Sequence, residues 1–212
     1  MNSDMRVNKS LGLTLIELVI VVVILGFLTV TVIPKLLDLK EQAKKINIEG
    51  IAGSFATGIS LTRAKWVAEG RPNNGLQNSV DYNNSTFILT SENKIENIQA
   101  GYVTGITDGE NLDQIFDAAN CVEIWINILH NPPSITVSLA SLNDKHSISY
   151  RYYASKSGTF SSSRCHFYLK ESLERSENGD YIDPEMSTEV GNSFTYQPSN
   201  SSVIVYVQDV EP

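Results

Sequence analysis

Histidine is scarce in this chain, and its copies do not stand at metal-ligand spacings. The three histidines, His130, His146 and His166, fall in separate predicted elements, and we expect each one at the surface, solvated or hydrogen-bonded. The chain also lacks a Gly-x-Ser-x-Gly nucleophile motif and a glycine-rich phosphate-binding loop. These absences leave no basis for a catalytic, cofactor-binding or metal site, and we expect a protein that is not an enzyme.

Carboxylates gather in two places, but neither cluster has the spacing of a calcium-binding loop. The clusters are Asp108, Glu110, Asn111 and Asp113, and farther along Asp180, Asp183 and Glu185. A turn followed by a helix N-terminus, where acidic side chains are favoured, explains the first cluster without a metal. The sequence leaves calcium binding by these loops open.

Positive charge is also in deficit. The chain has 16 lysines and arginines against 24 acidic residues, a formal net charge of −8. No cluster of basic residues with interleaved aromatic side chains is present. Because nucleic-acid binding depends on neutralising phosphates, this charge balance disfavours a nucleic-acid partner.

Long apolar runs are absent except near the N-terminus. The stretch Leu18–Ile33 holds no charged residue, and counted from Leu13 the segment has about 21 residues. As a helix it would measure about 31 Å, which is enough to cross the hydrocarbon core of a bilayer once. Arg6 and Lys9 precede it, so the positive-inside bias predicts a cytoplasmic N-terminus and sends residues 34–212 outward.

The chain has two cysteines, Cys121 and Cys165, and both lie on the predicted outward side. In an oxidising compartment we expect them to form one disulfide; two buried free thiols are the alternative. Closing a loop of about 45 residues would restrict the unfolded chain by roughly 4 kcal/mol in the chain-entropy model.

The apolar segment differs from a secretory signal sequence. It is longer than the usual apolar core, and no small-x-small cleavage site follows it at Ile33-Pro34-Lys35. An ordinary signal anchor is a possible alternative, but Glu17 stands at the edge of the aliphatic run. Because a carboxylate in hydrocarbon costs at least about 2–3 kcal/mol, an acid in this position indicates a function.

The residues Leu11-Gly12-Leu13-Thr14-Leu15-Ile16-Glu17-Leu18 resemble the processing motif of type IV prepilins. In that family a short charged leader ends in glycine, and the glutamate is fifth in the mature chain. The resemblance implies that a prepilin peptidase cuts between Gly12 and Leu13 and that the new amine of Leu13 is methylated. One departure is that the family usually has phenylalanine where this chain has Leu13.

Cleavage after Gly12 would create an amine four residues before Glu17. Opposite charges about 4 Å apart attract by roughly 4 kcal/mol at an effective dielectric constant near 20. The amine and the carboxylate can neutralise each other within one helix or between neighbouring subunits. A pair between subunits would set the axial stagger of one subunit on the next, as a buried polar residue sets coiled-coil register. The alternative is that Glu17 reaches into the lipid headgroups.

A single long helix is expected from Leu13 to Glu69, with Gly70 and Pro72 marking its end. Proline removes a backbone donor, so we expect a kink between Gly26 and Pro34; the pilin resemblance implies that this stretch melts when subunits assemble. In the second half, one face is apolar at helical spacing, and we expect it to pack on a sheet. That face comprises Ile48, Ala52, Phe55, Ile59 and Trp66.

The remaining residues predict an α+β head with an antiparallel sheet laid on the long helix, as in the type IV pilin fold. We therefore divide the chain into a leader (1–12), a transmembrane or filament-core helix (13–33), its amphipathic continuation (34–70) and a globular head (71–212). Expected strands and a second helix are read from alternation and helical periodicity. The strands are expected at 86–90, 147–153, 164–169, 193–196 and 203–207, and the helical region at 112–129.

Two stretches of the head, residues 61–72 and residues 121–133, resemble minor pilins of the mannose-sensitive haemagglutinin (MSHA) pilus. The resemblance implies a subunit that moves from the inner membrane, with its head in the periplasm, into a surface filament for adhesion. Its implied partners are other pilin subunits, the prepilin peptidase and the pilus assembly machinery. The alternatives are a minor pseudopilin of a type II secretion system and, in another class, a membrane-anchored periplasmic enzyme or binding protein.

Overall fold

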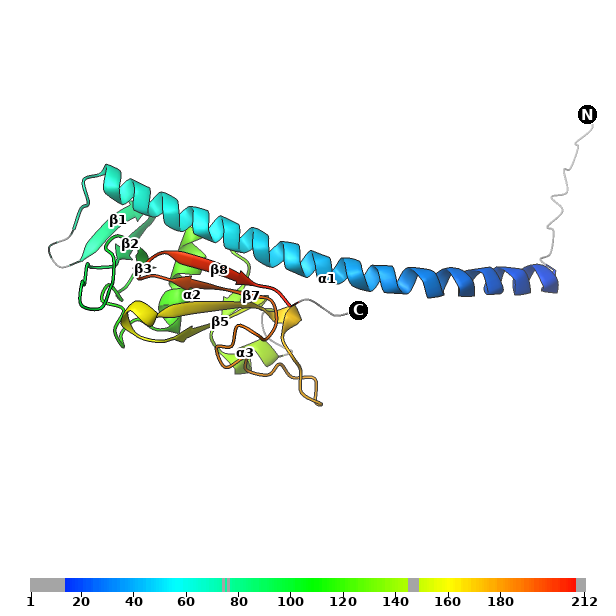
Figure 1. The fold of residues 1–212 in the computed structure, drawn as a ribbon. Helices are drawn as coiled ribbons and strands as arrows, with labels where there is room; N and C mark the ends of the chain where they lie inside the picture. The colour runs from blue at the N-terminus through cyan, green and yellow to red at the C-terminus, as the bar shows by residue number, and fades with distance from the viewer. Residues whose placement is uncertain (1–13, 74, 76, 145–148, 209–212) are drawn as a thin grey trace, which may run out of the picture. The chain divides into compact units, whose positions relative to one another are not determined.

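A computed structural model describes residues 14–73, 75, 77–144 and 149–208 of the chain (Figure 1). The leader and both proposed processing residues, Gly12 and Leu13, lie outside the described residues, as does His146. The chain divides into two compact units, Met1–Gln42 and Ala43–Pro212, and each is described by itself.

Helix α1 (Leu15–Ala68) runs from the first unit into the second. The Thr14 hydroxyl accepts a hydrogen bond from the Glu17 amide at 3.3 Å, which satisfies one of the unpaired donors of the first turn. The helix continues through Gly26 and Pro34. It ends where Gly70 and Arg71 take left-handed φ values of 83° and 60°, and the Arg71 amide closes the last turn on the Trp66 carbonyl at 2.8 Å.

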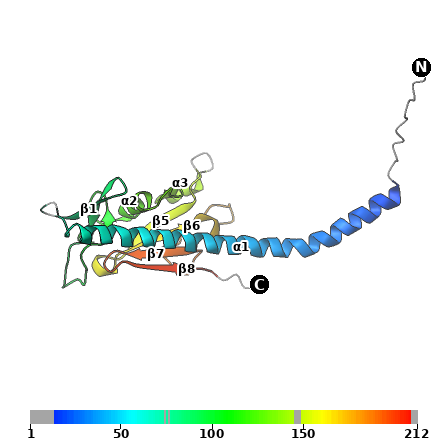
Figure 2. The ribbon, with the colours of Figure 1, turned by 90° about the horizontal axis from the view of Figure 1, so that it is seen from above.

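The head is built around the expected apolar face of α1. Ile48, Ala52, Phe55, Ile59 and Trp66 are all buried, as the helical spacing predicts. In Figure 2 this part of α1 lies along the strands of the larger sheet. The ring of Phe55 lies between 5.3 and 5.5 Å, centroid to centroid, from three aromatic rings on the sheet. These rings belong to Phe167, Phe194 and Tyr196.

The larger sheet has five strands in the order β4-β5-β6-β7-β8. Its strands are antiparallel except for the short β4, which pairs parallel to β5. Their bounds are β4 (Ile135–Thr136), β5 (Tyr152–Ser157), β6 (Arg164–Leu169), β7 (Ser193–Gln197) and β8 (Ser202–Tyr206). The predicted α+β architecture, a long N-terminal helix on an antiparallel sheet, is confirmed, and so are β6 and the β7–β8 hairpin.

A second sheet has three antiparallel strands, β1 (Asn78–Tyr82), β2 (Ser85–Leu89) and β3 (Val103–Gly105). The turn between β1 and β2 consists of Asn83 and Asn84, with φ values of 49° and 68°. Two consecutive left-handed residues match the twist of the flanking strands, and asparagine tolerates this conformation better than most residues.

Helix α2 (Ala118–Ile128) begins later than predicted, because the segment from Leu112 to Asp117 is not helical. Leu112 has φ 54°, and Asp117 caps the helix by accepting from the amides of Ala119 at 2.6 Å and Asn120 at 3.3 Å. The Asn120 side chain accepts in return from the Asp117 amide at 2.9 Å. The apolar spacing upstream came from a loop, in which Leu112 and Phe116 are buried and Ile115 is exposed.

Strand β5 also departs from the prediction, since it covers 152–157 and not 147–153. Residues 147 and 148 lie outside the described residues. The turn after β5 contains Gly158 at φ 68°, where a Cβ would lie 2.3 Å from the Ser162 carbonyl oxygen. That glycine-dependent turn pairs Ser157 with Arg164 and so extends β5 along all of β6.

The remaining short helices are α3 (Leu139–Asn143) and the 3-10 turns η1 (Phe160–Ser162) and η2 (Lys170–Ser172). Leu142 of α3 packs with Tyr153, Tyr168 and Leu173 on the sheet face opposite α1. Both faces of the sheet are therefore covered. This explains why His166, predicted at the surface, is buried beside them, with its Nε2 2.7 Å from the Ser157 hydroxyl.

Candidate assembly interface

The first unit carries the predicted functional residues of α1 on a helix that is apolar on all sides. From Leu15 to Leu39 the described aliphatic and aromatic side chains are exposed, among them Phe27 and Val30, each about three-quarters exposed. By length and composition α1 can cross a membrane. A helix that is apolar all round requires either lipid or other protein around it.

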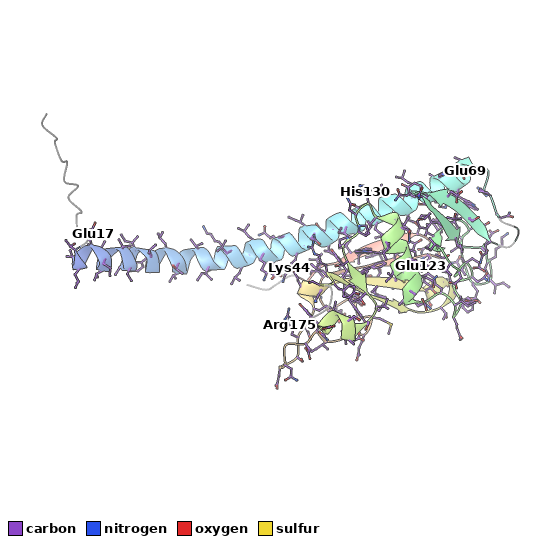
Figure 3. All side chains as sticks on the ribbon, turned by 180° about the vertical axis from the view of Figure 1, so that it is seen from behind. Glu17, Lys44, Glu69, Glu123, His130 and Arg175 are labelled. Atoms are coloured by element: carbon purple, nitrogen blue, oxygen red, sulfur yellow. A yellow bond between two sulfur atoms is a disulfide. The ribbon has the colours of Figure 1, made fainter. Side chains whose placement is uncertain are left out.

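Glu17 lies in the first turn of this helix, and Figure 3 shows it at the end of the described helix farthest along the chain from the head. Its carboxylate is the acidic group of the first turn, where the helix macrodipole favours negative charge. The next charged residue along α1 is Lys35. The structure thus places one carboxylate at the start of about five turns of uncharged helix surface.

Gly26 and Pro34 lie within that uncharged surface. A Cβ built on Gly26 would meet nothing within 4 Å, and Pro34 has no amide to donate to the preceding turn. The Thr29 hydroxyl donates to the Leu25 carbonyl at 2.7 Å, within the same stretch. Glycine and proline both lower the helix propensity of this segment relative to its aliphatic neighbours.

In the head, the structure joins Cys121 of α2 to Cys165 of β6 in a disulfide, with their Cα atoms 5.6 Å apart. Both residues are fully buried in the main core, beside Trp125 and Phe167, whose ring centroids lie 5.1 Å apart. The bridge fastens the small helix to the middle of the larger sheet.

One head contact was not anticipated from the sequence. The Tyr152 hydroxyl on β5 donates to the Asn47 side chain on α1 at 2.5 Å, across 105 residues of chain. Tyr152 is fully buried, and burial raises its pKa to about 12. Asn47 directly precedes the apolar face of α1, so this bond sets the position of α1 along the sheet.

The acidic clusters have structural partners. Asp108 accepts from the Asn120 side chain at 2.9 Å, and Asp113 accepts from the Ile115 amide at 2.9 Å. Asp183 likewise accepts from the Glu185 amide at 2.9 Å. Across the described ranges, no group of three histidine, cysteine, aspartate or glutamate residues is placed to hold a metal ion. These carboxylates act in turns and caps.

Comparison with known proteins gives one informative similarity. The chain is 38% identical over 61 residues to the type IV narrow pilus major component PilA5 of Thermus thermophilus. The match covers 28% of this chain and 53% of that protein, so the chain spans about half the length of the relative it matches. No protein-family model and no solved structure matches. The similarity and the architecture together show a chain that resembles a type IV pilin and has the α+β layout of the type IV pilin fold.

Proposed function

We propose that this protein is a subunit, specifically a minor subunit, of an MSHA-like type IV pilus. The observation that carries the proposal is the single carboxylate of Glu17 at the start of an apolar helix surface that nothing in the described chain covers. The similarity to a type IV pilus component supports the same function. In this role the protein is structural and adhesive, and it needs neither an active site nor a cofactor.

Processing comes first in the proposed sequence of events. A prepilin peptidase removes residues 1–12 by cutting between Gly12 and Leu13, and the new amine of Leu13 is methylated. Before assembly, residues 13–33 cross the inner membrane once and the head lies in the periplasm. The assembly machinery then moves the helix into the filament, where apolar surfaces of neighbouring subunits replace lipid.

Within the filament, Glu17 pairs with the N-terminal amine of a neighbouring subunit. Burying a carboxylate without a partner costs several kcal/mol, so only a stagger that joins the two charges is favourable. The segment between Gly26 and Pro34 unwinds locally to let helices pack closely, because those two residues contribute least to helix stability. The same features would serve a type II secretion pseudopilus, and the filament that contains the protein distinguishes the two.

The processing step provides the test. Intact mass and N-terminal sequencing of the membrane-bound protein should show a mature chain that begins at Leu13. Gly12→Leu should leave the heavier precursor in the membrane. Gly53→Leu provides the matched control, because a Cβ at that exposed helical glycine would meet nothing within 4 Å. A mature chain that begins elsewhere, or normal processing of the Gly12 variant, would refute the proposed function.

A further inference from the structure

A pocket with an excess of positive charge lies in the head, between the last turns of α1 and the loop that joins β2 to β3. Its volume is about 380 Å³, within the range of about 300–1,000 Å³ that small-molecule sites occupy. The residues that carry the argument are Arg63, Trp66, Arg71, Asn93, Lys94 and Gln99. Nothing in the proposed assembly role requires this pocket.

Two guanidinium groups at the pocket lie over aromatic rings and make no ion pair within the described residues. Arg63 lies 4.6 Å from the ring centroid of Tyr102, and Arg71 lies 5.9 Å from that of Trp66. The Nε of Arg63 is buried without a hydrogen-bond partner, so Arg63 meets a ligand through its Nη groups. A guanidinium that lies over a ring still has N–H groups at its edge, and two of these match the two oxygens of a carboxylate.

The charge of the lining contrasts with that of the chain. Arg63, Arg71 and Lys94 line the pocket against one acid, Glu92, in a chain with a net charge of −8. The carbonyls of Trp66 and Val67, at the negative end of α1, already accept from the amides of Arg71 at 2.8 Å and Gly70 at 3.1 Å. These bonds occupy two carbonyls of the helix end, and the excess of two cations over acids in the lining favours an anion in the concave site.

Two side-chain amides add neutral donors beside these cations. The side-chain oxygen of Asn93 accepts from the backbone amides of Ile95 and Glu96, both at 3.1 Å. The side-chain oxygen of Gln99 accepts from the Tyr102 hydroxyl at 3.2 Å. With both oxygens occupied, the NH₂ groups of Asn93 and Gln99 remain to donate. Such donors suit hydroxyl groups placed next to a carboxylate.

The pocket wall is held in place before any ligand arrives. Backbone hydrogen bonds of 3.0 and 2.8 Å join Asn93 and Ile98 in both directions. The backbone amide of Gln99 donates to the Ser199 carbonyl at 3.0 Å. Gly101, at φ 91°, lets the chain pass against Trp66, since a Cβ there would lie 2.3 Å from the indole ring. A preformed wall lowers the entropy cost of binding.

We propose that this pocket binds a sugar acid, with the carboxylate on Arg63 and Arg71 and the hydroxyl groups on the amides of Asn93 and Gln99. The guanidinium pair selects a carboxylate, the amides select neighbouring hydroxyls, and the volume accommodates one monosaccharide unit. An acidic peptide shares the carboxylate but lacks the hydroxyls, so it is the competing occupant.

The test uses the full chain in uncharged detergent micelles, titrated with glucuronate at low salt and followed by the two tryptophan indole N–H resonances. The Trp66 indole donates to the Pro72 carbonyl at 2.9 Å beside the pocket, whereas the Trp125 indole donates to Pro133 inside the core. Glucuronate should shift the Trp66 signal saturably and leave Trp125 unchanged. Glucose, which lacks the carboxylate, and a short polyglutamate peptide should bind at least about tenfold more weakly.

Charge variants distinguish a site from general attraction. Arg63→Gln and Arg71→Gln should each weaken glucuronate binding about tenfold or more, and Glu92→Gln should strengthen it. Arg175→Gln is the matched control, since Arg175 also stacks on a ring, 4.2 Å from that of Tyr181, and Figure 3 shows it at the other end of the head from Glu69, which follows α1. Unchanged affinity in both pocket arginine variants, no shift at Trp66, or tighter binding of the peptide would overturn the proposal.

Discussion

Residues that join α1 to the larger sheet determine where the long helix sits in the head. The Asn47–Tyr152 hydrogen bond and the Phe55 ring cluster both connect α1 to strands far away in the sequence. Phe55 could be assigned to the core from helical periodicity. Tyr152 could not be paired with Asn47, because the start of β5 depends on the turn at Gly158.

Tyr152→Phe should lower the stability of the head by about 1 kcal/mol at neutral pH, since it removes the hydroxyl that donates to Asn47. Burial raises the pKa of Tyr152 to about 12 in the folded chain, whereas the unfolded chain keeps the ordinary value of 10. The resulting stabilisation of the folded state is fully present below pH 10 and is lost as pH rises from 10 through 12. Urea unfolding followed by tryptophan fluorescence measures both effects. Tyr206→Phe is the control, and equal stability of the two variants would contradict the assignment.

His166 should make the head sensitive to acid. Burial, with a smaller contribution from Arg164, lowers its pKa from 6.5 to about 4. The unfolded chain therefore takes up a proton first, and the stability present above pH 6.5 falls as pH drops towards 4, by about 3 kcal/mol at most. His166→Gln should flatten this decline in urea unfolding measured from pH 7 to pH 4. The exposed His130→Gln is the control, and a decline unchanged by His166→Gln would contradict the prediction.

Among the helices and strands, the sequence predicted the long helix, β6 and the β7–β8 hairpin correctly, because each has an uninterrupted local pattern. The predicted start of α2 was wrong, because the buried loop residues Leu112 and Phe116 have helical spacing but no helical backbone. The burial of His166 was missed because alternation separates the two faces of a strand but does not say what covers the second face. Here α3 and the loops after β6 cover it.

The disulfide between α2 and β6 should contribute substantially to the stability of the head. It spans 44 positions of chain, so reduction releases a long loop in the unfolded state. We expect Cys121→Ala with Cys165→Ala to lower the unfolding free energy by roughly 2–5 kcal/mol, measured as a lower Tm. Adding reductant should lower the Tm of the wild type to that of the double variant and leave the double variant unchanged. A wild-type Tm insensitive to reductant would contradict this contribution.

On the scale of the whole molecule, the two units carry different kinds of information. The role proposed for the first unit rests on a local pattern that can be read in the sequence, one acid at the start of an uncharged apolar run. The pocket in the head cannot be read from the sequence, because Arg63 and Arg71 meet Asn93 and Gln99 only after the β2–β3 loop folds against α1. Local patterns predict helices and strands, whereas such a site depends on contacts between distant segments.

Docking of the subunit into the filament is proposed to depend on Glu17. The most direct test is the amount of Glu17→Gln protein in sheared surface filaments, divided by its amount in the inner membrane. Glu49→Gln, an exposed acid of the same helix within the head, is the matched control and should match the wild type. We expect Glu17→Gln to be processed and folded normally but to show a clearly lower ratio, because the neighbour's amine loses its charged partner. A ratio equal to that of the wild type would show that Glu17 does not govern docking.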